Sequence, residues 1–258
     1  MNLRIALLLV ISLLTFTGCS DGSDQPSRQL TVLVTNDDGI GAPGIDSLVN
    51  ALLELDYVDV TVVAPAENQS GSSDNTTEGD LVWMDSATSS GFVGIAVFGF
   101  PADSVNVALG PLGIVPDLVV SGVNSGQNVG PLASLSGTVG AARTAARAGF
   151  PAVATSAGLS SNADFDAAAD LVVAWIEDNR QALANNSANL DTITSFNVPG
   201  CTAGDIRELV AVPLADAIPD GGNVFFTDCS VEPASPPDSD VDAMLKGFAS
   251  VTQVPLEF

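Results

Sequence analysis

Apolar residues near the start of the chain gather into three segments whose spacing predicts a strand, a helix and a second strand. Residues 30–36, LTVLVTN, form a continuous run rich in β-branched side chains, and residues 58–65, VDVTVVAP, form a second run that ends in turn residues. Between them, residues 44–55 repeat isoleucine and leucine at helical spacing. This order predicts a β-α-β unit with parallel strands.

The same alternation continues through the middle of the chain. The pattern predicts further strands in residues 94–100, 116–126 and 150–158, and helices in residues 101–112, 136–149 and 164–183. Strands that are apolar throughout are buried on both faces, and the helices between them cover those faces. The sequence therefore predicts an α/β fold with a doubly wound, mostly parallel sheet.

Four polar segments rich in Asp, Asn, Ser and Gly stand where a predicted strand ends or a helix begins. They are residues 35–39, 64–73, 121–130 and 134–140. Each alone is explained by Asx turns, glycine turns or helix caps. Because ligands of open parallel sheets collect outside the carboxyl ends of the strands, four such segments at one edge predict a binding site.

Two adjacent carboxylates, Asp37 and Asp38, follow the first strand directly. Like charges side by side at the end of a buried strand are costly unless a cation lies between them. Ser70 and Asn124 can add neutral oxygens, and a site with few protein ligands suits magnesium or manganese. A divalent cation held there can polarise a phosphoryl oxygen and lower the pKa of a bound water, which then attacks phosphorus.

The start of the helix predicted after residue 136 offers a place for the phosphate itself. Residues 136–140, SGTVG, supply backbone amides and the hydroxyls of Ser136 and Thr138, with the helix dipole aligned to help. Arg143 and Arg147 lie four residues apart on one face of the same helix. We expect these arginines to be exposed or salt-bridged, with a substrate contact as the alternative.

Composition and charge limit the kinds of ligand and function that the chain can have. The chain has 258 residues, 46% of them hydrophobic, with 31 acidic against 7 basic side chains and a net charge of -24. This content excludes a disordered chain, and the acidity disfavours binding of nucleic acid polymers. The absence of histidine makes structural zinc improbable. A phosphoryl-accepting receiver domain needs a lysine near its aspartates, but the one lysine is Lys246, far down the chain.

The N-terminal segment is typical of an export signal. Arg4 precedes an apolar run, and the small residue Gly18 precedes Cys19. We expect residues 1–19 to be a lipoprotein signal peptide with lipidation at Cys19, and ordinary secretion is the alternative. Residues 20–29 would be a polar tether. The protein would then be an exported, periplasmic or membrane-anchored protein of the cell envelope that meets the membrane only through the lipid.

Export also affects the two other cysteines. In an oxidising compartment, Cys201 and Cys229 are expected to form one disulfide.

Five motifs in order, from residue 30 almost to the end, resemble the SurE family of survival-protein nucleotidases and acid phosphatases. They are VTNDDGIGAPGI, VTVVAPAENQSGSS, PDLVVSGVNSGQNVG, SGTVGAARTAARAGFPAVATS and SDVDAMLKGFASVTQVPL. The resemblance implies a divalent-metal phosphomonoesterase that hydrolyses nucleoside 5'- or 3'-monophosphates. It also implies a Rossmann-like core in residues 30–258, with a short C-terminal arm over about 198–258 that is used in oligomerisation, so that a homodimer is expected.

The resemblance also assigns site residues by position. The metal ligands would be Asp37, Asp38, Ser70 and Asn124, and one of the two aspartates would also transfer a proton. The residues placed around the phosphate or substrate would be Asn36, Gly71, Asn128, Ser136, Gly137 and Thr138.

The chain departs from the family before its SGT triplet. Cytosolic members commonly have an acidic residue and a tyrosine there, whereas this chain has Leu132 and Leu135. The alternative to an active phosphatase is an envelope lipoprotein that binds the metal or nucleotide without turnover.

Overall fold

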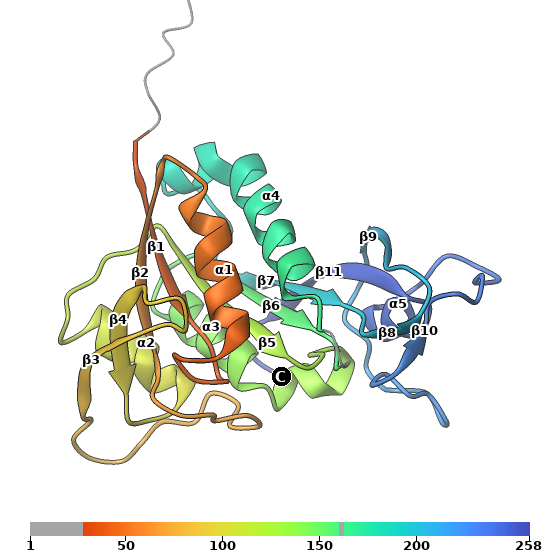
Figure 1. Ribbon diagram of the computed structural model, residues 1–258, viewed down its shortest axis with the longest axis horizontal. Helices are drawn as coiled ribbons and strands as arrows, with labels where there is room; N and C mark the ends of the chain where they lie inside the picture. Colours follow the sequence, from red (N-terminus) through yellow and green to blue (C-terminus); the bar gives the residue numbers. More distant parts are fainter. Residues whose placement is uncertain (1–27, 160–162) are drawn as a thin grey trace, which may run out of the picture.

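The central feature is a mixed, mostly parallel sheet with helices on both faces (Figure 1). A computed structural model describes residues 28–159 and 163–258, and within them nine strands form this sheet in the order β3-β4-β2-β1-β5-β6-β7-β11-β9. The α/β, Rossmann-like fold predicted from the sequence is confirmed. The predicted signal peptide, the lipidation at Cys19 and most of the tether lie outside the described residues.

The first β-α-β unit forms where the apolar pattern predicts it. Strand β1 spans Leu30–Thr35, helix α1 spans Pro43–Leu53 and strand β2 spans Val58–Pro65. β1 pairs in parallel with β2 from Leu30 opposite Val58 onward. The remaining elements are β3 (Trp83–Ala87), β4 (Val93–Val97), α2 (Pro101–Leu109), β5 (Leu118–Ser125), a 3-10 helix (Gly130–Ser134), α3 (Gly137–Arg147), β6 (Ala152–Ala157), α4 (Phe165–Ala184), β7 (Thr192–Val198), β8 (Cys201–Ala203), β9 (Arg207–Ala211), β10 (Thr227–Asp228), α5 (Asp240–Leu245) and β11 (Phe248–Pro255).

The helices divide between the two faces of the sheet. Helices α1 and α4 pack together on one face, where Leu48, Leu52 and Ile176 are fully buried against the strands. Helices α2 and α3 pack together on the other, and the alanine-rich surface of α3 lies close to β5 and β6. Small alanine side chains let α3 approach the sheet closely, so its N-terminus is held rigidly beside the strand ends.

The order of strands reverses between β1 and β5. Strand β1 pairs in parallel with β2 on one side and with β5 on the other. From β1 the chain proceeds outward to β2 and β4, and then returns to β5, β6 and β7. The carboxyl ends of β1 and β5 therefore flank the switch point, which is the usual ligand-binding crevice of such sheets.

The C-terminal part contributes to the main sheet as well as to an arm. Strand β11 pairs antiparallel with β7, and β9 pairs with β11 at the edge of the sheet. Residues 198–258, interpreted from the sequence as an arm, therefore include two strands of the sheet, and only the part around β8, β10 and α5 projects beyond it (Figure 1).

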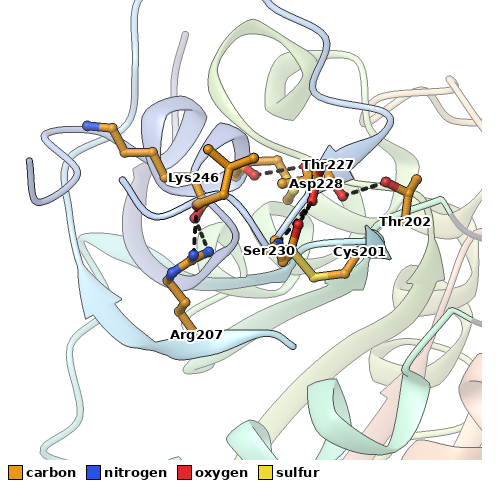
Figure 2. The surroundings of a disulfide bond; sticks show 10 residues. Cys201, Thr202, Arg207, Thr227, Asp228, Ser230 and Lys246 are labelled. Atoms are coloured by element: carbon orange, nitrogen blue, oxygen red, sulfur yellow. Dashed lines mark hydrogen bonds between the residues drawn. A yellow bond between two sulfur atoms is a disulfide. The ribbon is translucent and has the colours of Figure 1, made fainter. Parts of the chain in front are cut away.

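A disulfide between Cys201 and Cys229 closes this projecting part, with the two Cα atoms 5.5 Å apart. Figure 2 shows how hydrogen bonds surround it. Arg207 donates to the carbonyls of Lys246, at 2.7 Å, and Val231, at 2.8 Å. The disulfide thus joins two segments of the arm, and Arg207 fixes the arm to the residue that follows α5.

In the parts of the chain that the structure describes, none of the helices has the length and apolar character needed to cross a membrane.

Candidate active site

Asp37 lies just beyond the end of β1 and is almost completely buried, with 2% of its surface exposed. The hydroxyl of Thr138, at the start of α3, donates a hydrogen bond of 2.7 Å to Oδ1 of Asp37. Burial raises the pKa of Asp37 to about 6, because the charged form loses solvation. The hydrogen bond from Thr138 opposes this rise, and the charge of Asp38 adds to it. Asp37 is therefore a carboxylate held in place and poorly solvated.

Asp38 is partly exposed and is held through both of its oxygens. Asn68 donates to Oδ1 at 2.9 Å, and the backbone amide of Ser125 donates to Oδ2 at 2.8 Å. Burial raises the pKa of Asp38, and these two hydrogen bonds act in the opposite direction. The side chain thus joins the ends of β1, β2 and β5 at the switch point.

Hydrogen bonds bring all four polar segments together. The amide of Gln69 donates to the carbonyl of Asp37 at 2.7 Å, and the amide of Ser73 donates to the carbonyl of Leu135 at 3.0 Å. With the bonds from Thr138 and Ser125, these contacts connect residues 35–39, 64–73, 121–130 and 134–140 into one cluster. The expectation that the segments meet at one edge of the sheet is correct.

The start of α3 approaches Asp37 so closely that only glycine fits at position 137. A Cβ atom on Gly137 would lie 2.8 Å from both Cβ of Asp37 and Oγ of Ser72. Ser136 caps the helix, its hydroxyl accepting a hydrogen bond of 3.1 Å from the amide of Val139. A helix N-terminus is an anion-binding position, and here it lies directly beside the aspartate pair.

A bulge in β5 positions Asn124. Between Ser121 and Asn124 the pairing with β6 shifts register, so that this strand carries one extra residue at the edge of the site. The side-chain nitrogen of Asn124 donates to the carbonyl of Gly126 at 2.7 Å, so its side-chain oxygen is the atom that could bind a cation.

Asn128 lies deeper and is fixed from two neighbouring strands. Its backbone amide donates to Oδ1 of Asn197 at 2.7 Å, and its side chain donates to Oγ of Ser156 at 2.8 Å. Residues on β6 and β7 therefore orient the loop that follows β5.

Three other predicted residues have distinct surroundings. The side chain of Asn36 donates to the carbonyl of Gly39 at 2.8 Å and accepts from its amide at 3.2 Å. Asn36 therefore braces the turn that carries the two aspartates, and both ends of its amide are engaged there. Ser70 and Gly71 are exposed, and Gly71 has a φ of 76°, which favours glycine.

The two arginines of α3 are salt-bridged. Asp74 accepts from Arg143 at 3.0 Å and from Arg147 at 2.6 Å. Arg143 is also buried, with only 3% of its surface exposed. These contacts tie α3 to the loop after β2, which agrees with the salt-bridged interpretation of the pair.

The donor set suits a hard divalent cation. Within residues 28–159 and 163–258, no site gathers three or more Asp, Glu, His or Cys side chains, so the aspartate pair would be completed by neutral oxygens and solvent. Poorly solvated adjacent carboxylates, with the carbonyl oxygen of Asn124 and the hydroxyl of Ser70 on adjoining loops, are the oxygen ligands that magnesium and manganese prefer.

Several residues of the cluster were not predicted from the sequence. Asn68 and the amide of Ser125 hold Asp38, and Asn197 holds Asn128. Asn68 stands within a polar segment that the sequence did single out. Asn197 belongs to β7, whose contribution depends on tertiary pairing and gives no local signal.

The sequence and fold are similar to those of known proteins. Residues 32–218 match the family described as Survival protein SurE. The chain is 34% identical over 245 residues to the 5'-nucleotidase SurE of Desulfovibrio desulfuricans, covering 89% of this chain and 94% of the relative. It is 35% identical over 238 residues to the 5'-nucleotidase SurE of Methylococcus capsulatus, covering 88% and 91%. The crystal structure of the SurE protein from Aquifex aeolicus superposes with a TM-score of 0.69 at 28% identity, covering 88% of this chain and 94% of that one.

Proposed function

The chain belongs to the Survival protein SurE family, and from this premise we propose that it is a divalent-metal-dependent nucleotidase. Its substrates would be nucleoside 5'- or 3'-monophosphates, and its products the nucleoside and phosphate. Relatives named 5'-nucleotidase SurE, each aligned over most of both chains, support the nucleotidase activity.

The observation that carries the proposal is the aspartate pair at the switch point, with Asp37 buried and Asp38 partly exposed, directly beside the start of α3. Asp37 is held by Thr138, and Asp38 is held by Asn68 and Ser125. A cation and an anion-binding helix end both favour hydrolysis of a phosphomonoester, and the carboxylates that would hold the cation lie beside such a helix end here. The chain has 31 acidic and 7 basic residues. A metal ion and a helix N-terminus would therefore bind the phosphate in place of a cluster of lysines.

Asp37, Asp38, Ser70 and Asn124 would hold the metal ion. A divalent cation there supplies Lewis-acid stabilisation of the charge that develops on the phosphoryl oxygens.

The chain's own groups supply binding and orientation. Ser136 and Gly137, at the start of α3, would bind the phosphate, and Thr138 keeps the Asp37 carboxylate in one orientation. We assign proton transfer to Asp38, because its side chain lines an open cavity whereas Asp37 is 2% exposed.

The decisive experiment measures phosphate release by the domain that starts at residue 20. The substrates are nucleoside 5'- and 3'-monophosphates and p-nitrophenyl phosphate, each with magnesium, manganese or chelator. Asp37→Asn should reduce release at least about 100-fold while the protein stays folded. The matched control is Asp85→Asn, on the exposed edge strand β3, which should retain wild-type rates.

Two outcomes would contradict the proposal. Wild-type rates in Asp37→Asn would reject the metal assignment. No release from folded protein under any metal would favour an envelope protein that binds metal or nucleotide without turnover.

Export is a further part of the proposal. Arg4, the apolar run after it and the Gly18–Cys19 pair support a lipoprotein signal peptide, with Cys19 as the first mature residue. The enzyme would then release phosphate and nucleosides from external nucleotides. Mass spectrometry of the mature N-terminus tests this, and an unmodified, freely soluble N-terminus would remove the lipid anchor.

We also propose that the arm supports a homodimer, as the resemblance to the family implies. Sedimentation analysis tests this, and a monomer at all concentrations would reject it.

A further inference from the structure

An open cavity of about 470 Å³ adjoins the aspartate pair. Its lining includes Asp38, Gly39, Gly44, Ala66, Ser125 and Phe165. The cavity therefore begins at a proposed metal ligand and ends at an aromatic ring on another segment. Its size lies within the range of small-molecule sites, and its mostly uncharged walls are typical of them.

We propose that this cavity binds the nucleoside part of the substrate, with the base stacked on Phe165. The inference rests on the proposed function and names the structural basis of its substrate class. Stacking on an aromatic ring accepts any base, because every base has a π-face. The proposed enzyme would thus prefer nucleotides over phosphomonoesters that carry no base.

Phe165 is partly buried and packs against the hydrophobic core. It is the first residue of α4, and Asp164 caps this helix by accepting a hydrogen bond of 3.0 Å from the amide of Ala167. A Cβ atom on Gly44 would lie 3.3 Å from Cδ1 of Phe165, so the missing side chain leaves room for the ring. A ring that already packs against the core loses little freedom when a base stacks on it.

Asp38 sets the direction of the bound nucleotide. A phosphate bound beside Asp38 would place the nucleoside next to the cavity that this residue lines, and Phe165 lines the same cavity. The backbone of Gly39 and Ser125 borders the path between them.

Charge beyond Phe165 favours a single phosphate. A neighbouring hollow shares Pro43 and Phe165 with the cavity and is lined by Asp46, Asp164 and Asp166. Carboxylates there repel a second phosphate on the far side of the nucleoside. A nucleoside monophosphate therefore suits the site, and a nucleoside 3',5'-bisphosphate does not.

Another hollow is the main alternative location for the base of the nucleotide. It measures about 250 Å³ and is lined by Gln69, Thr77, Phe98 and Phe100, among others. Neither Asp37 nor Asp38 lines it. The cavity at Phe165 is favoured because, of these two, it alone is lined by one of the two aspartates, Asp38, and Phe98 supplies a matched aromatic control.

The test compares AMP with glycerol 2-phosphate, which carries no base. Phe165→Leu keeps an apolar side chain that can pack against α1 but removes the π-face. It should lower kcat/KM for AMP about 10-fold, chiefly through KM, and leave glycerol 2-phosphate unchanged. Phe165→Trp should restore the preference for AMP. Phe98→Ala should behave as wild type with both substrates.

Three kinetic outcomes would overturn the inference. They are an equal loss on both substrates in Phe165→Leu, no loss on AMP, or a selective loss in Phe98→Ala instead.

A binding measurement separates this inference from the proposed function. Adenosine binding is measured in chelator by saturation-transfer NMR, with wild type, Phe165→Leu and Phe98→Ala. If only Phe165→Leu loses adenosine binding, the cavity assignment is supported, even where wild type hydrolyses no nucleotide. Absence of hydrolysis by wild type would reject only the proposed nucleotidase activity. Equal adenosine binding by all three proteins would overturn the cavity assignment even if AMP is hydrolysed.

Discussion

The hydroxyl of Thr138 donates a hydrogen bond of 2.7 Å to the carboxylate of Asp37, across 101 residues of sequence. This contact joins the end of β1 to the start of α3. It places a poorly solvated carboxylate at the positive end of a helix, where a phosphate would also be attracted. The same bond therefore influences the ionisation of Asp37, the proposed metal site and the geometry of the proposed phosphate site.

Thr138→Val should shift the pH dependence of metal binding. The hydroxyl lowers the pKa of Asp37 against the larger effect of burial, so its removal should raise that pKa further above about 6. Because a carboxylate must be ionised to bind a cation, manganese affinity should fall up to roughly 10-fold below about pH 6, with a smaller loss near neutral pH, and the pH midpoint of binding should rise. Titration calorimetry over a range of pH measures both effects.

Thr138→Ser should restore the wild-type midpoint. Thr144→Val, in the same helix, is the matched control, because the Thr144 hydroxyl bonds only to the carbonyl of Gly140 among the described residues. An unchanged midpoint in Thr138→Val would show that the hydroxyl does not control the ionisation of Asp37.

The stability of the metal-free protein should depend on the ionisation of Asp37. Its pKa is about 6 in the folded protein against 3.8 for an unperturbed aspartate, so the neutral form is favoured by folding. This contribution is fully present below about pH 4 and is lost as the pH rises through about 6. A shift of about two pKa units corresponds to roughly 3 kcal/mol of unfolding free energy.

Urea unfolding in chelator, compared between wild type and Asp37→Asn, measures this contribution. The advantage of wild type over the variant should shrink between about pH 4 and pH 7, and manganese should restore stability most at the higher pH. A pH-independent difference would contradict the assignment.

The sequence predicted the first β-α-β unit well because its signals there are local, whereas the edge strand β3 was not predicted. The apolar runs of β1 and β2 and the helical spacing of α1 are each contained within about ten residues, and the structure places them within one or two residues of the prediction. The convergence of polar segments also follows from local data, because parallel strands necessarily end at one edge.

The strands of the C-terminal half could not be predicted in the same way, because their positions depend on tertiary pairing. Strand β11 pairs antiparallel with β7, which lies about fifty residues earlier in the sequence, and no local pattern specifies that partner. For the same reason, Asn197 could not be predicted to orient Asn128. Asn36 shows a different limit: its position in the motif suggested a substrate contact, whereas its side chain is engaged with Gly39.

The disulfide should stabilise the arm without serving the site. Cys201 and Cys229 are 28 residues apart, and closing a loop of this length contributes about 3–4 kcal/mol. Replacing both cysteines by serine should lower the free energy of urea unfolding by about that amount. Nucleotidase activity at low temperature should remain, because neither cysteine contacts the four polar segments. Reductant should destabilise wild type and leave the double variant unchanged, and an equal response of the two proteins would contradict this role.

The buried carboxylate of Asp240, on α5, connects the arm to the loop beside the candidate site. Asp240 is 1% exposed, and its oxygens accept hydrogen bonds of 2.8 Å from the amides of Gly130 and Ala215. Gly130 ends the loop that carries Asn128, whereas Ala215 belongs to the arm. Burial raises the pKa of Asp240, and these amides oppose the rise. The carboxylate thus joins two segments that no strand pairing connects directly.

Asp240→Asn should therefore destabilise the protein and weaken substrate binding together. The asparagine presents one amide group as a donor where the aspartate had only acceptors, so a buried backbone amide loses its partner at a cost of about 1–3 kcal/mol. KM for AMP should rise because the loop around Asn128 loses its support. Asp242→Asn, two residues along the same helix, removes a partly exposed ion pair with Lys246 and should cost about 1 kcal/mol or less with no change in KM. Urea unfolding and steady-state kinetics measure the two effects, and equal behaviour of both variants would show that the arm does not support the site through Asp240.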